Sequence, residues 1–332
     1  MTSIRDLEIA LGESKERVIT QGEMINRENL GKSIFTKKLI KTDTVLTRNM
    51  LEIKSPGQGM NPQLLEKIIG KKVYRRILKG KPLFDSDLRR PVKPKKNYNT
   101  KLKWGIPVRL HDVKNLLKII SPNVVEFHMS YDDINRDIHE YLNDIHSCGF
   151  LVHAPELFKN DHLLDLCTSD KKYRDLSIRN LQSVINITEK LKAFFPKTIA
   201  PYIIVNCGGF TKNSFLNKNL RNKLYNNLID SLQRLDVKST VIIPQTMAPF
   251  PWHFGGQRYQ NLFMDKDEII KFCIKTDSFI CHDISHSYMA CMYHKWDHLE
   301  YIKELAKYTK HYHIADARGV DGEGLQIGEG DI

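Results

Sequence analysis

Acidic and imidazole side chains gather near the end of the chain, between residues 279 and 331. Asp283 and His286 form an Asp-x-x-His pair directly after a short apolar run, and His313 and Asp316 occur in a second run. Carboxylates and imidazoles are side chains that bind divalent metal ions and that transfer protons near neutral pH. The sequence therefore predicts a site for metal binding or acid–base chemistry in this part of the chain.

The segments that must position these groups have the pattern of a parallel sheet with helices. From Trp104 onward, short apolar runs alternate with helical stretches, which is typical of βα units. The runs span residues 106–110, 124–128, 150–153, 202–207, 241–245, 279–283 and 312–316, and helices are expected near 111–120, 132–146, 173–194, 215–235, 265–275 and 295–309. Seven runs predict an α/β fold in which residues 104–332 form a (β/α) TIM-type barrel that lacks its last βα unit.

In such a barrel the side chains at the carboxyl ends of the strands converge on one mouth. Polar residues end or follow most of the runs: Glu126, His128, His153, Glu156, Asn206, Gln245, Asp283, His286 and His313. A divalent ion held by carboxylate and imidazole groups can polarise a carbonyl or a hydroxyl of a sugar. An isomerase or epimerase also needs a base, typically a carboxylate, to remove a proton next to the carbonyl.

The loop at residues 246–263 concentrates aromatic and basic side chains directly above the predicted mouth. Trp252, His253 and Arg258 lie around a Gly-Gly pair in this loop. Aromatic faces stack on sugar rings, and an arginine can bind a carboxylate or a phosphate. These three residues are therefore predicted to bind substrate. The alternative is that the loop packs its own aromatic rings as a lid or an interface.

Length and composition set broad limits on the protein. The 332 residues suffice for one large domain and one small one. The sequence contains no apolar run of about 18 residues, so neither a membrane span nor a signal peptide is predicted. The six cysteines lack Cys-x-x-Cys spacing, which favours a reducing compartment over a disulfide framework. We therefore expect a cytoplasmic protein.

Positive charge is concentrated at the N-terminal end of the chain. Residues 1–100 contain 22 Lys or Arg against 11 Asp or Glu, so they carry a net +11 of the chain's +12. Such a module can meet nucleic acid, an anionic sugar or phosphate, or an acidic neighbouring domain. Lysines that only face solvent give the same composition.

Residues 1–88 have the pattern of a compact module rich in turns. Short strand-like runs occur at 32–35, 45–46, 51–54 and 72–77, and one short helix is expected from Asn61-Pro62 to Gly70. Residues 89–103 contain two prolines, many charges and few apolar side chains. This composition predicts an extended linker between the module and the barrel.

Several landmarks occur in order within the N-terminal module. They are Asn26-Arg27, Lys32-Ser33, the Lys54-x-Pro56-Gly57-x-Gly59 turn, Gly70-Lys71-Lys72, and Pro82-Leu83 with Asp87-Leu88. Together they resemble the antifreeze-like (SAF) domain that closes N-acetylneuraminate and related nonulosonate synthases. The resemblance implies a small β-clip fold that lends a basic residue to a sugar site, for which Arg27 and Lys32 are the candidates.

The first residues, RDLEIALGESKERVITQGEMINRENL, are similar to the end of the synthase barrel that precedes this domain in the same family. The resemblance implies that the chain is a C-terminal piece of a longer synthase-family protein. It also implies an upstream synthase barrel or a homo-oligomer as partner, with no membrane partner and no expected nucleic-acid partner.

A second resemblance covers residues 104–332. It rests on VHAPE at 152–156, the Asp283-x-x-His286 pair, HIAD at 313–316 and GEGLQIGEGD at 322–331. These motifs resemble the xylose-isomerase-like TIM barrels, which include sugar-phosphate isomerases, epimerases and endonuclease IV. The resemblance implies that Gln245, Asp283, His286 and His313 lie at ligand positions for a divalent ion (Mn, Mg, Zn or Co). The implied catalytic acids and bases are Glu126, His153 and Glu156.

The two resemblances favour a carbohydrate biosynthesis module of the sialic acid or nonulosonate type. In this interpretation an isomerase- or epimerase-like barrel binds a sugar or sugar phosphate beside a synthase SAF domain. Asn206 and Gln245 stand where metal-binding members carry stronger ligands, which favours a non-catalytic sugar-binding or assembly module as the alternative. A further alternative is a metal-dependent nuclease of the endonuclease IV kind, with the basic module holding DNA.

Overall fold

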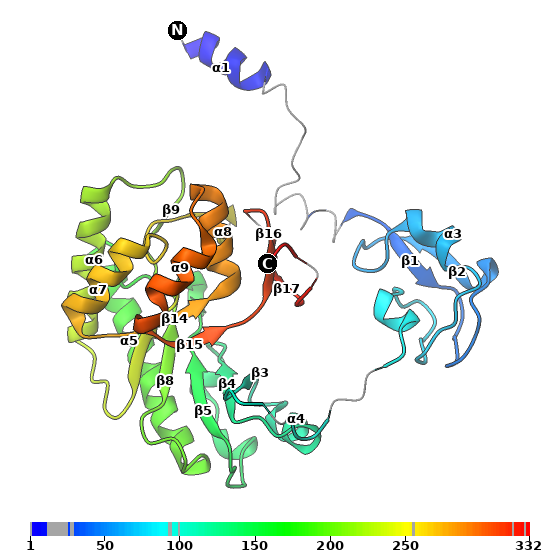
Figure 1. The fold of residues 1–332 in the computed structure, drawn as a ribbon, viewed down its shortest axis with the longest axis horizontal. Coiled ribbons are helices and arrows are strands. Elements are labelled where there is room, and N and C mark those ends of the chain that lie inside the picture. The colour runs from blue at the N-terminus through cyan, green and yellow to red at the C-terminus, as the bar shows by residue number, and fades with distance from the viewer. Residues whose placement is uncertain are drawn as a thin grey trace. The chain divides into compact units, whose positions relative to one another are not determined.

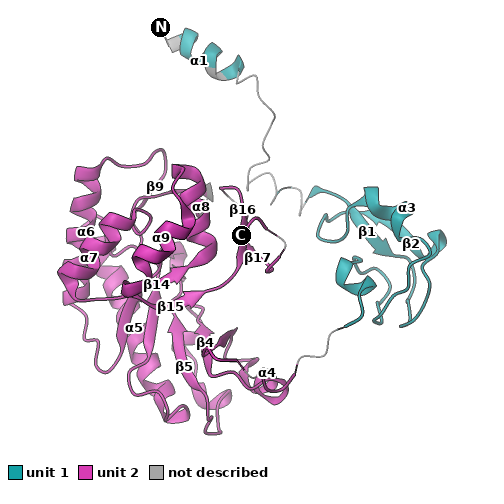
Figure 2. Cartoon of the chain, viewed as in Figure 1, with its two compact units in different colours: residues 1–92 teal, residues 93–332 magenta. Residues whose placement is uncertain are grey.

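The structure is a computed structural model, in which residues 2–11, 26, 30–91, 95–98, 100–253, 256–320, 322–328 and 330–332 are described. The chain divides into two compact units, residues 1–92 and 93–332 (Figure 2). The division falls inside the segment 89–103, which has the composition of a linker. Among the described residues, no helix combines the length and the apolar character that crossing a bilayer requires.

The first unit is built on a small antiparallel ribbon (Figure 1). β1 (Ser33–Thr36) pairs with β2 (Leu51–Lys54), and further bridges join Phe35 to Pro82, Ile40 to Ile77, and Val45 to Lys72. α1 (Thr2–Leu11) and α3 (Leu65–Ile68) are its described α-helices. Its core consists of Ile34, Ile40, Leu46, Leu51, Leu65, Ile68, Val73, Ile77 and Leu83. These elements confirm the strands predicted at 32–35 and 51–54 and the short helix, whereas the runs predicted at 45–46 and 72–77 form only isolated bridges.

Seven parallel strands form the sheet in the described part of the second unit. They are β3 (Gly105–Val108), β4 (Val124–His128), β5 (Gly149–His153), β8 (Tyr202–Val205), β10 (Val241–Pro244), β14 (Ile280–Asp283) and β15 (Thr309–His313). The first five pair in the order β10-β8-β5-β4-β3, and β14 pairs with β15. A parallel bridge between Gln245 and Cys281 joins the two groups. The strands therefore follow one another around the sheet in chain order, as consecutive βα units do.

Alternation along the strands decides which side chains face the barrel interior. On β5, Phe150 and Val152 join the large core under the helices, whereas Leu151 belongs to a separate buried layer. That layer takes one residue from each of four strands: Leu151, Ile204, Ile243 and Cys281. Because every second residue shares a face, the residues two positions later point the same way: His153, Asn206, Gln245 and Asp283. The interior is therefore apolar below and polar at the carboxyl ends of the strands.

Six α-helices accompany this sheet within the described residues. They are α4 (Val113–Ile119), α5 (Lys171–Leu191), α6 (Lys218–Gln233), α7 (Lys266–Thr276), α8 (Ile284–His294) and α9 (His298–Leu305). The prediction of a helix at residues 132–146 is wrong. Two single 3-10 turns form there instead, at Asp133–Asn135 and Ile138–Glu140. The carboxylate of Asp137 accepts a hydrogen bond from the backbone N–H of His139, and such local bonds compete with a helix.

Short antiparallel pairs complete the described part of the second unit. They are β6 (Leu157–Phe158) with β7 (His162–Leu163), β9 (Phe210–Thr211) with β13 (Tyr259–Gln260), β11 (Trp252–His253) with β12 (Gly256–Gln257), and β16 (Asp316–Arg318) with β17 (Gly322–Leu325). The last pair folds against α8, because the backbone N–H of Gly324 donates to Oγ of Ser285 at 3.1 Å. This contact brings the Gly-rich tail to the carboxyl end of β14.

Candidate active site at the barrel mouth

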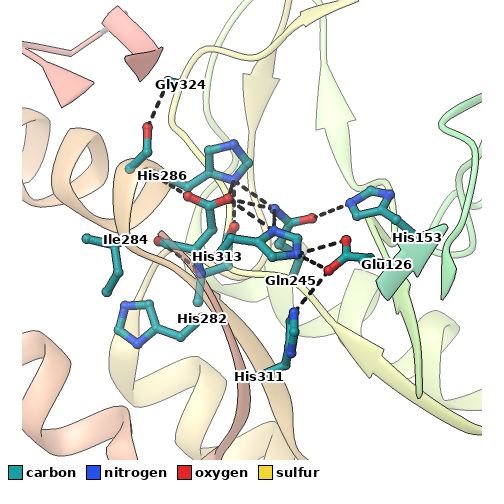
Figure 3. A network of polar contacts seen from close by, with 12 residues as sticks. Glu126, His153, Gln245, His282, Ile284, His286, His311, His313 and Gly324 are labelled. Atoms are coloured by element: carbon teal, nitrogen blue, oxygen red, sulfur yellow. Dashed lines mark hydrogen bonds and ion pairs between the residues drawn. The ribbon is translucent and has the colours of Figure 1, made fainter. Parts of the chain in front are cut away.

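Side chains from five strands meet at the carboxyl end of the barrel (Figure 3). Glu126 lies on β4, His153 on β5, Asp283 on β14 and His313 on β15, and Gln245 directly follows β10. Oε1 of Glu126 lies 3.0 Å from Nε2 of His313, although 187 residues separate the two along the chain. The barrel thus assembles one site from residues that the sequence places far apart.

Gln245 occupies the centre of this mouth. Its Nε2 atom lies 3.0 Å from Oδ2 of Asp283, 3.2 Å from Nδ1 of His313 and 3.5 Å from Nδ1 of His286. Its Oε1 atom lies 2.9 Å from Nε2 of His153. The structure therefore brings together the four residues predicted as metal ligands. The amide nitrogen of Gln245 faces the other three.

The Asp-x-x-His pair is also a helix cap. Asp283 ends β14 and caps α8, and its Oδ1 atom accepts a hydrogen bond from the backbone N–H of His286 at 2.9 Å. An N-cap side chain bonds to the third helical residue in this way, so the cap by itself accounts for the spacing of the pair. The first turn of α8 then holds the His286 ring at the mouth.

His286 carries a positive charge at neutral pH. Its Nδ1 atom donates to the carbonyl of Thr246 at 2.8 Å, and its Nε2 atom donates to Oε1 of Glu323 at 2.9 Å. Burial lowers the pKa of His286, but the charges of Asp283 and Glu323 outweigh burial and raise that pKa to about 10. Both ring nitrogens are thus protonated and engaged.

These contacts decide whether the predicted ligands fit a divalent ion at the mouth. An amide N–H is a hydrogen-bond donor and has no lone pair for a cation, and Gln245 directs this group between Asp283 and His313. In this arrangement the amide N–H of Gln245 lies between Asp283 and His313, and the four residues do not fit a metal ion there.

Three imidazoles surround the carboxylate of Glu126 on the inner side of the mouth. Nε2 of His128 lies 2.9 Å from Oε1, Nε2 of His313 lies 3.0 Å from Oε1, and Nε2 of His311 lies 3.0 Å from Oε2. Burial alone would raise the pKa of Glu126, but these hydrogen bonds hold it far below its usual range. Glu126 is therefore ionised under all ordinary conditions and is a weak base.

The sequence reasoning did not assign His311 to the site. His311 precedes His313 by two residues on β15, so both side chains share one face of the strand. Strict alternation along the strand was the signal that could have identified it. The strand itself begins at Thr309, three residues before the predicted apolar run, because its inward face carries histidines.

His153 and Glu156 flank the mouth on the side of β5. Nδ1 of His153 lies 3.0 Å from the carbonyl of Ala154, and its Nε2 faces Oε1 of Gln245. Burial lowers the pKa of His153, whereas both of its ring nitrogens face oxygen acceptors. Oε1 of Glu156 accepts a hydrogen bond from Nδ2 of Asn206 at 3.1 Å. These contacts hold His153 against Gln245 and Glu156 against Asn206.

A groove of about 1510 Å³ reaches the inner side of this network. Its walls come from β3, β4 and β5 on one side and from β15 on the other. Glu126, His128, His311 and His313 all line it. Solvent-sized molecules can therefore reach the Glu126 carboxylate without passing between Gln245 and Asp283.

The structure gives less information about the residues predicted to bind substrate. Arg27 lies outside the described residues, as do the side chains of Trp252 and His253, whose backbone forms β11. Arg258 is half-buried, and its backbone N–H donates to the carbonyl of Pro251. In the first unit, Lys32 is exposed immediately before β1.

Two aromatic rings of the loop, those of Phe250 and Tyr259, pack against each other and toward α8. The ring centroid of Phe250 lies 5.6 Å from that of Tyr259 and 5.0 Å from that of Tyr293 on α8. The Phe215 ring contacts all three, at 5.5, 5.1 and 5.3 Å. These rings therefore hold the loop to α8 instead of standing free above the mouth.

Comparison with known proteins gives a family match and several fold matches. The model of the xylose isomerase-like TIM barrel family matches residues 119–332. No curated protein matches the chain. Among solved structures, the chain is similar to a D-tagatose 3-epimerase-like protein (19% identity; 68% of this chain and 82% of that chain; TM-score 0.48). It is also similar to L-ribulose 3-epimerase (13%; 68% and 73%; 0.44) and to endonuclease IV from Thermus thermophilus (14%; 67% and 79%; 0.42).

Proposed function

Because the chain belongs to the xylose isomerase-like TIM barrel family, we propose that its barrel binds a sugar or sugar phosphate and moves a proton beside the carbonyl group. The observation that carries this proposal is the buried chain of contacts from Glu126 through His313, Asp283 and Gln245 to His153. Such a chain offers proton acceptors and proton donors to one bound molecule.

In this proposal Glu156 is the base and His153 is the acid. Glu126 is unsuited to proton abstraction, because the pKa of its carboxyl group is held far below the usual range by three imidazoles. Glu156 is the remaining carboxylate of the predicted acids and bases, and its Oε1 atom accepts an amide hydrogen bond from Asn206. Burial lowers the pKa of His153, so its imidazole is neutral and has a single N–H proton to donate.

The proposed reaction passes through an enediol. Glu156 takes the proton from the carbon beside the carbonyl while His153 gives a proton to the carbonyl oxygen. Return of the proton to the neighbouring carbon, with loss of the adjacent hydroxyl proton to His153, gives an isomer. An epimer forms instead when a proton from solvent reaches the opposite face of the same carbon, the enediol hydroxyl proton returns to His153, and Glu156 releases its proton to solvent. The imidazolium of His286 would stabilise negative charge that develops on the substrate oxygens.

Solvent exchange tests the proposal. The chain is incubated in D2O with a panel of aldoses, ketoses and their phosphates, and deuterium uptake beside the carbonyl is followed by proton NMR. We expect uptake for at least one member of the panel and a loss of about 10²–10⁴-fold in rate for Glu156→Gln. Glu66→Gln is the matched control, because Glu66 is an exposed residue of the first unit.

Two further assays separate the alternative functions. Sugar binding in calorimetry without any deuterium uptake would overturn the catalytic proposal and leave a sugar-binding module. The amide of Gln245, which fills the centre of the mouth, favours this second reading. Incision of abasic-site duplex DNA, lost as salt rises, would instead identify a nuclease.

For the first unit, we propose that residues 30–88 are an antifreeze-like domain of the nonulosonate synthase type. Three landmarks of that resemblance pack against one another. Oγ of Ser33 donates to the carbonyl of Pro56 at 2.6 Å, and a Cβ atom at Gly59 would lie 2.8 Å from the carbonyl oxygen of Leu83. A side chain at position 59 would therefore collide with the backbone of Leu83, so the turn can pack against Pro82-Leu83 only with a glycine there.

A sialic acid ligand tests this part of the proposal. Calorimetry with N-acetylneuraminate should give saturable binding, weakened by Lys32→Ala because Lys32 offers an exposed cation before β1. Lys79→Ala, which removes another exposed lysine of the same unit, is the matched control. Absence of N-acetylneuraminate binding to the unmodified chain would contradict the proposal.

A further inference from the structure

We propose that the barrel binds one zinc ion through Glu126, His311 and His313, on the inner side of His313. One carboxylate oxygen and two imidazole nitrogens of these residues lie within 4.8 Å of one another, and within the described ranges no other set of histidine, cysteine and carboxylate groups does so. Two imidazoles and a carboxylate form zinc sites in metallohydrolases. Imidazole ligands favour zinc over magnesium or calcium.

The strands already hold the three ligands close to the geometry of a zinc site. His311 and His313 alternate on β15 and face the interior together, and Glu126 comes from β4. Nε2 of each histidine lies 3.0 Å from a Glu126 oxygen. Ligands about 2.0–2.3 Å from a tetrahedral zinc ion lie roughly 3.4 Å apart. The spacings between the Glu126 oxygens and the two histidine nitrogens are therefore close to those of a zinc site.

The residues of the mouth supply the outer support that a zinc ligand needs. Nδ1 of His313 lies 3.3 Å from Oδ2 of Asp283, which leaves Nε2 directed toward Glu126. Gln245 donates to the same Asp283 oxygen at 3.0 Å and so fixes the carboxylate. A carboxylate on the far nitrogen of a metal-binding histidine orients the ring and raises its basicity. The donors at the mouth thus position His313 instead of binding a metal themselves.

The groove gives the proposed ion a route in and an open coordination position. Glu126, His311 and His313 all line the groove. Three protein ligands leave a fourth tetrahedral position for water or for a substrate oxygen, as catalytic zinc sites do. His128 lies on the same side and donates to Glu126, so it holds the carboxylate in place when the ion is absent.

Calorimetric titration of the full chain with zinc chloride tests the site, whether or not any sugar is turned over. We expect one ion per chain, and His311→Ala should weaken affinity by more than about 100-fold, because losing a ligand costs more than losing an outer partner. Asp283→Asn should weaken it by about 10–100-fold. His286→Ala is the matched comparison, since His286 bonds to Thr246 and Glu323 and lies outside the proposed ligand set.

The variants His311→Ala and His286→Ala distinguish a zinc site on the inner side of His313 from one at the mouth. Retained zinc binding in His286→Ala with loss in His311→Ala supports the inner site, and the reverse pattern overturns it. Absence of zinc binding to the unmodified chain also overturns it. His311→Gln, which keeps a hydrogen bond to Glu126, and circular dichroism of each variant distinguish a lost ligand from a lost fold. Cobalt substitution should give the intense visible bands of a tetrahedral ion.

Discussion

The two units of the chain place their charges in opposite ways. In the first unit, the ion pair between Lys72 and Asp43 joins side chains that are 45% and 65% exposed. In the barrel, the pairs of His313 with Glu126 and with Asp283 join side chains that are at most 18% exposed. Exposed pairs contribute little to stability, whereas each buried charge depends on its partner. The basic module can therefore change its surface freely, and the barrel mouth cannot.

The largest effect should come from breaking the buried network. Glu126→Ala leaves three imidazoles without their shared carboxylate, and we expect a loss of about 3–5 kcal/mol in the free energy of unfolding. Glu66→Ala removes an exposed partner of Arg48 in the first unit and should leave stability unchanged. Urea unfolding of both variants makes the comparison. Equal small losses would mean that burial does not distinguish the two carboxylates.

A core substitution should show whether the two units unfold independently. Leu46→Ala truncates a fully buried side chain of the first unit and should cost that unit about 3 kcal/mol. The three tryptophans all lie in residues 93–332, so tryptophan fluorescence reports on the barrel alone. We expect an unchanged fluorescence midpoint and faster hydrogen exchange in peptides from residues 30–91. A shifted fluorescence midpoint would contradict independent unfolding.

The barrel should also lose stability in mild acid. His282 is fully buried, with Nε2 bonded to Ser287 and no hydrogen-bond partner for Nδ1 among the described residues. Burial lowers the pKa of His282 from 6.5 to about 4. Because this folded-state pKa lies below the unfolded value, the stabilisation is complete above pH 6.5 and is lost as pH falls toward 4.

Between pH 7 and pH 5 the His282 contribution amounts to about 2 kcal/mol. His282→Phe keeps a ring in the same space and removes the titrating group, so its stability should fall less over this pH range. Urea unfolding at both pH values measures the difference. An identical pH dependence in the variant would show that His282 is not the group responsible.

The smallest effect concerns an exposed helix cap of the barrel. The Asn217 side chain accepts a hydrogen bond from the backbone N–H of Leu220 at the start of α6. Asn217→Ala should cost about 1 kcal/mol, measured as a shift of the fluorescence-detected urea midpoint. A loss as large as that of Glu126→Ala would mean that the barrel responds to any local change and not specifically to buried charge.

The order of the strands could be predicted from the sequence because six of them carry apolar runs. The run at 124–128, for example, became β4 with the same bounds. The seventh strand was displaced, since Thr309–His313 alternates polar residues on both faces and has no apolar signature. The helix expected at 132–146 was lost to local hydrogen bonds of acidic side chains, which apolar periodicity does not report.

The site could be predicted only in part. The barrel geometry was enough to bring Gln245, Asp283, His286 and His313 together, because strand ends share one mouth. The hydrogen-bonding role of each group was not predictable. The amide of Gln245 faces partners 38 to 92 residues away, and that orientation depends on tertiary contacts that no local pattern encodes.

Anomalous diffraction from crystals soaked in zinc would test most directly which side of His313 binds the metal ion. The geometry predicts one anomalous peak bounded by Glu126, His311 and His313, with the Gln245 amide still donating to Asp283. A peak between Gln245 and Asp283 would require the amide to turn its oxygen inward. That result would contradict the inner site and restore the mouth as the metal centre.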